Sequence, residues 1–406
     1  MNWRALLFLG LTLATGAQLW FIQRAGWDAA WRFWHLDART PHFSDLRAIT
    51  GASDSLERGF DPREENPGAP FKQRFNQTSL WLQLRHLGIH ESDSTAVGLV
   101  MLAGYVVGLW WLAAGTGRLG AGLLGALVFS PAALLAVERG TTDLSVFFCL
   151  ALAGHLAATA PRGAFAAVLA GFWLKLFPLA GVVVFLREPR SRAIRLGLVA
   201  AGLTALFCLL NFRELVDIGY KTEKGPHTSY GWAVLSLHLR DAGAVGWSQP
   251  VYVAGAALAF LGLGLAGWTA RHVPGPAATS RALDFFRIGA AVYAGTFLLG
   301  ASWDYRFIFA LFLIPQLAEW IRSSDPSLRR WARGLLLALF VAVWSLALKD
   351  WAGASFAGQT AARALEETAK WALFYGCIHL LVRTLPAWAK PGRPTPPPAA
   401  PVPATR

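Results

Sequence analysis

Long apolar runs, separated by short polar ones, dominate the chain. Runs of this kind are typical of helices that cross the roughly 30 Å hydrocarbon layer of a membrane. The pattern therefore predicts an all-α fold, a polytopic transmembrane helix bundle. Eleven apolar blocks lie near residues 4–22, 96–114, 119–137, 144–160, 163–187, 194–212, 250–270, 285–301, 306–320, 333–349 and 369–385.

Two polar segments interrupt this pattern. Residues 23–95 are rich in charged side chains and in Pro and Gly turns, which predicts a folded extracytoplasmic loop with short surface helices. Residues 386–406 are Pro-rich, which is typical of a disordered tail. We therefore expect one transmembrane domain over residues 1–385, followed by a cytoplasmic tail. The N-terminal run has no convincing small-x-small cleavage site, so we expect it to be retained as the first span.

The block at 163–187 decides the topology. As a single span it would put the Arg-rich segments 187–195 and 322–333 outside, against the positive-inside rule. Lys175 and Pro178 lie near its middle, where a lysine is costly unless it reaches water or a partner. We therefore expect a broken or re-entrant pair of short helices, about 11 to 12 membrane segments in all, and cytoplasmic N- and C-termini. Non-helical backbone at this depth predicts a cavity beside the turn.

Composition favours the membrane class and excludes others. The chain has 406 residues, of which 55% are hydrophobic and 15% charged. The net charge of +13 does not indicate nucleic-acid binding, because the Arg residues are scattered among short loops. Cys149, Cys208 and Cys377 lie in apolar segments, which predicts neither disulfides nor a CxxC metal site. The motifs GxxxxGK[ST], HExxH and GxSxG are absent, which counts against P-loop nucleotide binding and against zinc or serine hydrolase chemistry.

The hairpin topology brings the remaining charged segments to one face of the membrane. They are residues 23–95, VERGTTD at 137–143, the turn at Lys175, residues 213–249 and WDYR at 303–306. Each also has a plainer interpretation. The helix around Asp45 could be an amphipathic interfacial helix, Asp143 could serve a helix start, and Trp303 with Tyr305 could anchor the chain at the headgroups.

Two further polar segments supply candidates. FKQRFNQTSLW contains Arg74 and Asn76, and KTEKGPHTSYGW contains His227 and Tyr230. Asn76 begins a glycosylation sequon, but the composition indicates a bacterial source, so we interpret the match as chance. A lone histidine such as His227 is more often structural or solvated than catalytic.

The order of these short motifs resembles a known family. The motifs are Asp45 in the first extracytoplasmic loop, a G-x-D-P turn (Gly59, Asp61, Pro62), ERGxxD (Glu138 to Asp143), K-x-x-P (Lys175, Pro178) and WDYR (Trp303 to Arg306). They resemble the polyprenol-phosphate-dependent glycosyltransferases of the GT-C superfamily, and within it the bacterial mannosyltransferase-like integral membrane proteins. The resemblance covers residues 1 to about 385.

The resemblance implies a function. Such an enzyme of the bacterial inner membrane would move a hexose or pentose, mannose-like, from a polyprenyl-phosphate donor to a hydroxyl of an extracytoplasmic glycan or glycolipid, with inversion. It implies that Asp45 is the catalytic base, with Asp54 a less favoured substitute. Many relatives have a Tyr after the DP turn and a Tyr-Pro-Pro element before the second span. This chain has DPREEN and RFNQTSLW instead, which leaves the sugar and the acceptor open.

The residue chemistry agrees with this implication. A carboxylate can take the proton of an attacking hydroxyl, and a leaving lipid phosphate needs cations. The predicted donor-phosphate ligands are Arg306, Lys175, Arg139 and Arg74. The residues predicted to bind or orient the substrate are Glu138, Asp143, Asp304, Asn76, His227 and Tyr230.

The cofactor and the reaction class have alternatives. No ligand spacing demands a metal, although Asp45, Glu138 or Asp304 could contribute to a divalent site, and no other cofactor is predicted. The alternative function is a transporter or lipid flippase without glycosyl transfer. Transporters tend to have internal repeats, and the sequence has none that we find.

Overall fold

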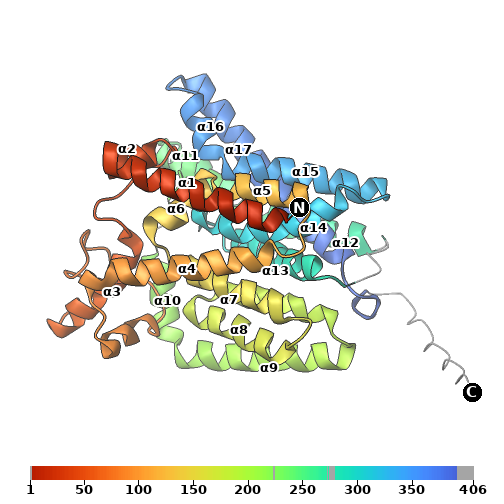
Figure 1. Cartoon of the computed structure of the whole chain (residues 1–406), viewed down its shortest axis with the longest axis horizontal. Helices are drawn as coiled ribbons and strands as arrows, with labels where there is room; N and C mark the ends of the chain where they lie inside the picture. The colour runs from red at the N-terminus through yellow and green to blue at the C-terminus, as the bar shows by residue number, and fades with distance from the viewer. Residues whose placement is uncertain (1, 223–224, 272, 274–278, 391–406) are drawn as a thin grey trace, which may run out of the picture.

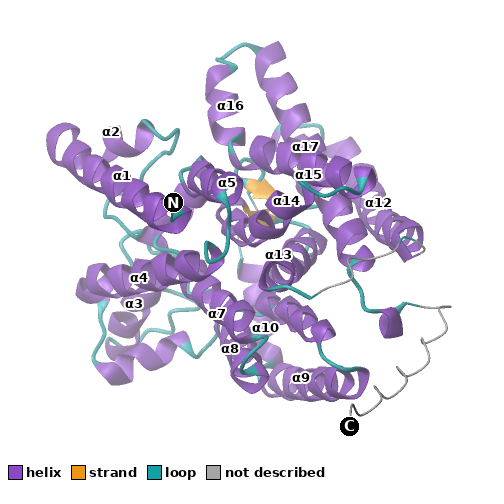
Figure 2. Ribbon diagram, turned by 45° about the vertical axis from the view of Figure 1, so that its right-hand side comes forward, coloured by secondary structure: helices purple, strands orange, loops and turns teal. Residues whose placement is uncertain are grey.

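The computed structural model describes residues 2–222, 225–271, 273 and 279–390, and helices make up most of it (Figures 1 and 2). The first half contains α1 (Trp3–Ala25), α2 (Trp27–Arg32), α3 (Ser44–Glu57), η1 (Trp81–Leu87), η2 (Glu91–Asp93), α4 (Ser94–Leu112), α5 (Arg118–Val128), α6 (Pro131–Arg139), α7 (Asp143–Leu156), α8 (Pro161–Leu174) and η3 (Phe177–Arg187). The second half contains α9 (Arg190–Leu210), α10 (Phe212–Lys221), α11 (Val234–Asp241), α12 (Val245–Arg271), α13 (Arg281–Leu298), η4 (Asp304–Leu313), α14 (Ile314–Trp320), α15 (Pro326–Val343), α16 (Ser345–Trp351), α17 (Phe356–Arg383) and η5 (Ala387–Ala389).

Within the described residues the only strands are two short ones. The strands β1 (Ser229–Tyr230) and β2 (Ser302–Trp303) pair antiparallel, with Ser229 opposite Trp303 and Tyr230 opposite Ser302. The all-α fold class predicted from the sequence is confirmed. The strand pair matters because it fixes the segment before α11 against the WDYR element.

Several of the helices can cross a membrane. Among the described residues, four are long and apolar enough: Trp3–Ala25, Glu91–Leu112, Arg190–Leu210 and Val245–Arg271. The number is six if the bent pairs α5 with α6 and α15 with α16 each form one span. The other predicted blocks form shorter helices, broken segments, or helices with internal charge such as α13. The predicted polytopic bundle is confirmed, and its helices are less regular than the apolar runs suggest.

The predicted break inside 163–187 is confirmed. Helix α8 ends at Leu174, Lys175 is extended with φ −152° and ψ 146°, and η3 begins at Phe177. The two elements run antiparallel, since Phe165 contacts Phe185, Gly181 lies against Val168, and Gly171 lies against Pro178. The chain therefore turns back at LKLFP, as the lysine and the proline predict.

The extramembrane loop satisfies the backbone that this turn exposes. Pro178 has no N–H to donate, so the last carbonyl groups of α8 lack helical partners. The Thr78 hydroxyl donates to the Trp173 carbonyl oxygen at 2.9 Å, and the Trp81 indole N–H donates to the Leu174 carbonyl oxygen at 3.3 Å. The loop therefore covers the non-helical backbone that would otherwise be costly at this depth.

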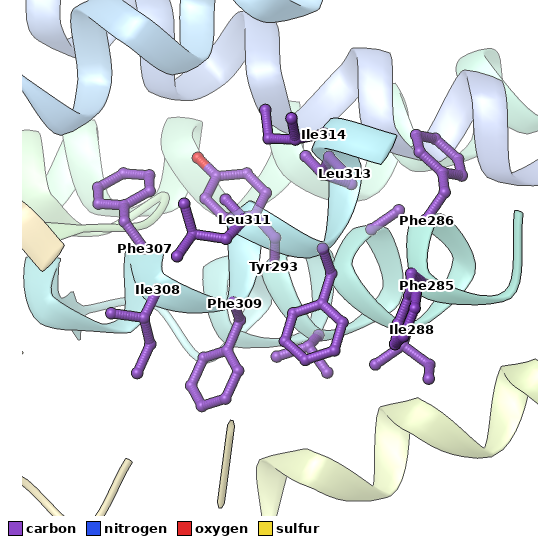
Figure 3. Packing of buried hydrophobic residues seen from close by; sticks show 14 of the residues in the cluster. Phe285, Phe286, Ile288, Tyr293, Phe307, Ile308, Phe309, Leu311, Leu313 and Ile314 are labelled. Carbon is purple, nitrogen blue, oxygen red and sulfur yellow. The ribbon is translucent and has the colours of Figure 1, made fainter. Parts of the chain in front are cut away.

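An aromatic core lies between α13, η4 and α14 (Figure 3). Phe285, Phe286 and Tyr293 of α13 face residues Phe307 to Ile314, and all of them are buried. Gly289 allows the close approach, because a Cβ there would lie 2.7 Å from the Phe312 Cβ. This packing holds η4, whose first residues carry the WDYR charges.

Charged residues gather at two opposite ends of the bundle. At the end distant from the extramembrane loop, Arg187 pairs with Asp284, and Arg383 pairs with Asp325 at 2.5 Å. Lys390 donates to the carbonyl oxygens of Val273 and Arg383, at 3.1 and 3.0 Å.

Of the tail predicted at residues 386–406, the structure describes residues 386–390. Residues 391–406 lie outside the described part of the chain.

Candidate active site

A cavity of about 760 Å³ lies where the extramembrane loop meets the bundle. Four of the charged segments that the sequence predicts on one face contribute to its walls: residues 23–95, 137–143, 213–249 and 303–306. Its lining residues are Arg39, Asp45, Ala48, Ile49, Phe71, Lys72, Gln73, Arg74, Phe75, Asn76, Gln77, Leu135, Arg139, Thr141, Thr142, Lys221, Thr228, Trp303 and Tyr305.

Asp45 faces this cavity from the first turn of α3. The residue is half-buried, and within the described residues its carboxylate makes no hydrogen bond or ion pair. The position suits a negative charge, because the N-terminus of a helix carries a partial positive charge. Burial raises the pKa of Asp45, while Arg139, Arg39 and Lys175 oppose that rise and Asp143 adds to it.

The start of α3 is anchored on α6. Phe43 has left-handed backbone angles (φ 58°, ψ 43°), and its N–H donates to the Glu138 carbonyl oxygen at 3.3 Å. Its ring packs on Gly140, where φ is 60° and an added Cβ would lie 2.8 Å from the Phe43 Cβ. A glycine is therefore required beside the Asp45 turn.

Glu138 and Arg139, adjacent at the end of α6, have different positions relative to the cavity. Glu138 is fully buried; its Oε1 accepts the Arg39 backbone N–H at 2.7 Å, and its Oε2 lies 2.9 Å from Arg139 Nε. Arg139 also donates to the Asp37 carbonyl oxygen at 3.3 Å, and its side chain lines the cavity. Glu138 thus orients a cation that lines the cavity and does not itself line it.

Lys175, Asp143 and Arg306 form a buried cluster adjacent to the cavity. Lys175 Nζ donates to Asp143 Oδ1 at 2.7 Å, and Arg306 Nε lies 3.6 Å from Asp143 Oδ2. None of the three lines the cavity, but the Tyr305 ring, which does, has its centroid 5.9 Å from Lys175 Nζ. Two cations around one carboxylate leave an excess positive charge near the cavity.

The other predicted site residues lie in three different environments. Arg74 and Asn76 line the cavity. Asp304 and Tyr230 are buried in the core, where the Tyr230 hydroxyl lies 2.7 Å from the Thr296 hydroxyl. His227 is exposed, does not line the cavity, and pairs with Asp241 at 3.1 Å.

Sequence reasoning missed two groups of charged residues. Arg39, Lys72 and Lys221 line the cavity, but they come from loops and a helix end that carry no motif. The second group surrounds Lys370, whose ammonium lies 2.7 Å from Glu366 Oε1 and 3.5 Å from Asp304 Oδ1. The sequence does contain one indication of this second group. Glu366 and Lys370 are four residues apart at the edge of an apolar block, a spacing that predicts an ion pair on a helix.

The carboxylates named for a divalent metal do not converge. Within the described ranges, the group of three that could ligate a metal is Asp54, Glu57 and His90, whose ligand atoms lie within 4.8 Å of one another. It lies outside the cavity lining, and Asp54 already accepts from the Glu91 backbone N–H at 3.0 Å and lies 2.9 Å from His90 Nδ1. Asp54 is therefore not placed as a substitute for Asp45.

Comparisons with known proteins do not assign the chain to a family. No family model matches the chain. No curated protein matches it. Among solved structures it is similar to the crystal structure of ArnT from Cupriavidus metallidurans in the apo state, with 17% identity over 92% of this chain and 78% of that chain and a TM-score of 0.36. A likeness of this strength says nothing about the activity of the chain.

Proposed function

We propose that the protein is a membrane glycosyltransferase that uses a lipid-linked sugar. It moves a mannose-like hexose or pentose from a polyprenyl phosphate to an acceptor hydroxyl on the extracytoplasmic side, with inversion. The observation that carries the proposal is Asp45, a carboxylate with no hydrogen-bond or ion-pair partner among the described residues, in a cavity whose lining also includes five basic residues. A base needs free lone pairs and access to substrate, and Asp45 has both.

Asp45 acts as the general base. Its carboxylate takes the proton of the acceptor hydroxyl while the hydroxyl oxygen forms a bond to the anomeric carbon. The bond from that carbon to the donor phosphate oxygen breaks at the same time, and the phosphate leaves with the electron pair. One displacement on the opposite face of the sugar inverts the anomeric configuration, so no second carboxylate is required.

Cations stabilise the leaving phosphate. Arg139 lines the cavity and is oriented by Glu138, and its planar guanidinium suits a phosphate. Lys175 and Arg306 add positive potential from behind the wall. Their preorganised charge stabilises negative charge as it develops on the leaving oxygen, which is where such groups contribute most to catalysis.

Replacing Asp45 tests the assignment. In vesicles with a short polyprenyl-phosphate sugar, Asp45→Asn is expected to lower the transfer rate by about 10² to 10⁴, the usual contribution of a general base. Asp61→Asn is the matched control, because Asp61 lies in the same loop, is exposed, and does not line the cavity. Unchanged transfer by Asp45→Asn would remove the base assignment.

The same vesicles separate the transporter alternative. If labelled lipid or sugar crosses the bilayer and no glycosidic product forms with any acceptor, the protein moves its substrate without chemistry. Product formation that depends on Asp45 excludes that alternative.

The proposal includes an orientation in the bacterial inner membrane, with both termini cytoplasmic. The hairpin at Lys175 and the Arg-rich segments support it through the positive-inside rule. Reporter fusions after residues 190 and 325 are both expected to report cytoplasm, and an extracytoplasmic signal from either would overturn the orientation.

A further inference from the structure

The cavity holds more cations than one donor phosphate needs. Five basic residues line it, against Asp45 as the acidic residue in the described lining: Arg39, Lys72, Arg74, Arg139 and Lys221. Arg139 is paired with Glu138 at 2.9 Å, and Lys221 with Glu64 at 2.5 Å. In the described part of the chain, the side chains of the other three make no ion pair and no hydrogen bond. Arg39 instead lies over the Phe71 ring, 5.7 Å from its centroid.

The wall that presents two of these cations is a fixed structure. Lys72 has a left-handed backbone, φ 51°, which is uncommon for a residue with a side chain and tends to occur at functional sites. The Asn66 side-chain amide donates to the carbonyl oxygens of Ala48 and Gln73, both at 2.9 Å. These bonds join the segment to α3, so Lys72 and Arg74 keep their place relative to Asp45.

A glycine contact strengthens this link. A Cβ on Gly51 of α3 would lie 2.5 Å from the Gly68 carbonyl oxygen, so the two backbones touch. Ala48 and Ile49 of the same helix line the cavity beside Asp45. The base and the cationic wall therefore belong to one packed unit, whereas Arg139 comes from α6.

The unpaired cations differ in the carboxyl group whose pKa they influence. Arg139, Arg39 and Lys175 are the cations that lower the pKa of Asp45. Lys221, the ion-pair partner of Glu64, lowers the pKa of Glu64 most, and Arg74 also lowers it. Arg39 lowers the pKa of Asp45 and also lies over the ring of Phe71, the residue before Lys72.

We propose that Arg39, Lys72 and Arg74 form a second anion subsite, which binds a phosphate or carboxylate group carried by the acceptor saccharide. The proposal rests on the proposed function and narrows its substrate class to an acidic acceptor. The acceptor must bring a hydroxyl to Asp45, and the subsite lies on the unit of chain that carries Asp45. Arg39, Lys72 and Arg74 are exposed at the cavity, so their donors are available to a ligand, and a phosphate or carboxylate accepts such charge-assisted hydrogen bonds.

Direct binding tests the subsite without any glycosyl transfer. The full chain in phosphatidylcholine nanodiscs is titrated with glucose, glucose 6-phosphate and glucuronate in the absence of donor. The two acidic sugars are expected to bind at least tenfold more tightly than glucose, since hydrogen bonds to charged groups are among the strong ones. Whichever of the two binds more tightly identifies phosphate or carboxylate as the preferred group.

The double variant K72Q/R74Q is expected to lose this preference. Its matched control is R58Q/R85Q, which removes two exposed arginines of the same loop that do not line the cavity, and which should keep the preference. Equal binding of glucose and glucose 6-phosphate by the unaltered protein overturns the proposal. Retention of the preference by K72Q/R74Q overturns it as well.

Competition with dodecyl phosphate separates the acceptor from the donor as the source of the anion. If the subsite serves the acceptor, dodecyl phosphate and glucose 6-phosphate bind together, and Arg139→Gln weakens only the former. Mutual displacement would assign these cations to the donor phosphate and overturn the proposal. Because Asp45→Asn measures transfer and these titrations measure binding, failure of one does not imply failure of the other.

Discussion

Two regions of the molecule hold charge in opposite ways. In the cavity, Asp45 and the cations Arg39, Lys72 and Arg74 have no ion-pair partner among the described residues. Around α17, in contrast, Lys370 is about 1% exposed and lies 2.7 Å from both Glu366 Oε1 and the Ser229 carbonyl oxygen. Asp304 and Glu367 complete that cluster at 3.5 and 3.6 Å, and Lys349 joins it through Glu366 at 3.0 Å.

The contrast shows how to assign charged residues in a membrane bundle. An ionisable residue within a membrane is by default a candidate for function. The Lys370 cluster shows a second use, because its lysine joins α17 to β1 and to the start of η4. The Asp304 N–H also donates to the Thr228 carbonyl oxygen at 2.8 Å, so this cluster supports the cavity wall formed by Thr228 and Trp303. The ion-paired charges around Lys370 join elements of the fold, whereas the cavity charges named above have no ion-pair partner among the described residues.

The largest expected effect comes from breaking the ion-paired cluster around Lys370. Lys370→Met leaves Glu366, Glu367 and Asp304 near one another with only Lys349 to compensate, and should lower the free energy of unfolding by about 3 to 5 kcal/mol. Thermal unfolding in detergent measures the loss. Lys349→Met is the matched control, since Lys349 is more exposed and pairs with Glu366 alone, and a smaller loss is expected.

A charge-conserving variant sharpens this prediction. Lys370→Arg keeps the positive charge but changes its shape, so it should recover part of the stability. If Lys370→Met and Lys349→Met destabilise equally, the Lys370 cluster does not hold the fold as described.

Replacing Asp45, in contrast to replacing Lys370, is not expected to lower the free energy of unfolding at neutral pH. Because burial raises the pKa of Asp45, the folded state holds this proton more tightly than the unfolded state does. The stability from this group is therefore present at low pH and is lost as pH rises from the unfolded value through the raised folded value. At neutral pH, Asp45→Asn should be as stable as the unaltered protein or slightly more stable, by less than about 1 kcal/mol.

The pH dependence of transfer follows from the same pKa. The base works only when deprotonated, so the rate should fall as pH drops through the raised pKa of Asp45. Arg139→Gln removes a cation that lowers this pKa, and it should shift that limb to higher pH. Measured pH profiles of both proteins check the shift. If the acidic limb of the profile stays at the same pH in Arg139→Gln, Arg139 does not influence the pKa of Asp45.

The sequence predicted the elements that hydrophobicity and single residues control. The helical bundle follows from the apolar runs, and the turn at Lys175 follows from a lysine and a proline that do not fit a span. The sequence also predicted Asp45, Arg74, Asn76 and Arg139 as site residues. All four lie in its lining.

The partners of charged residues could not be predicted. Asp304 is followed closely by Arg306, yet the two side chains belong to different clusters, one with Lys370 and the other with Asp143. Lys370 is 66 positions from Asp304 in the chain, and Lys72 depends on a left-handed turn held by Asn66. Such contacts arise from tertiary packing, which neither periodicity nor short motifs encode.

The smallest expected effect concerns His227, a predicted substrate residue that lies beside the cavity-lining Thr228. Its side chain is 57% exposed and its partner Asp241 is 56% exposed, and an exposed pair of this kind contributes 0 to about 1 kcal/mol. His227→Gln should therefore leave unfolding and the transfer rate nearly unchanged, as Asp241→Asn should. If His227→Gln lowers the transfer rate and Asp241→Asn does not, with stability unchanged in both, His227 contacts the substrate as the sequence predicts. The substrate site would then extend past Thr228, beyond the part of the cavity that the unpaired charges line.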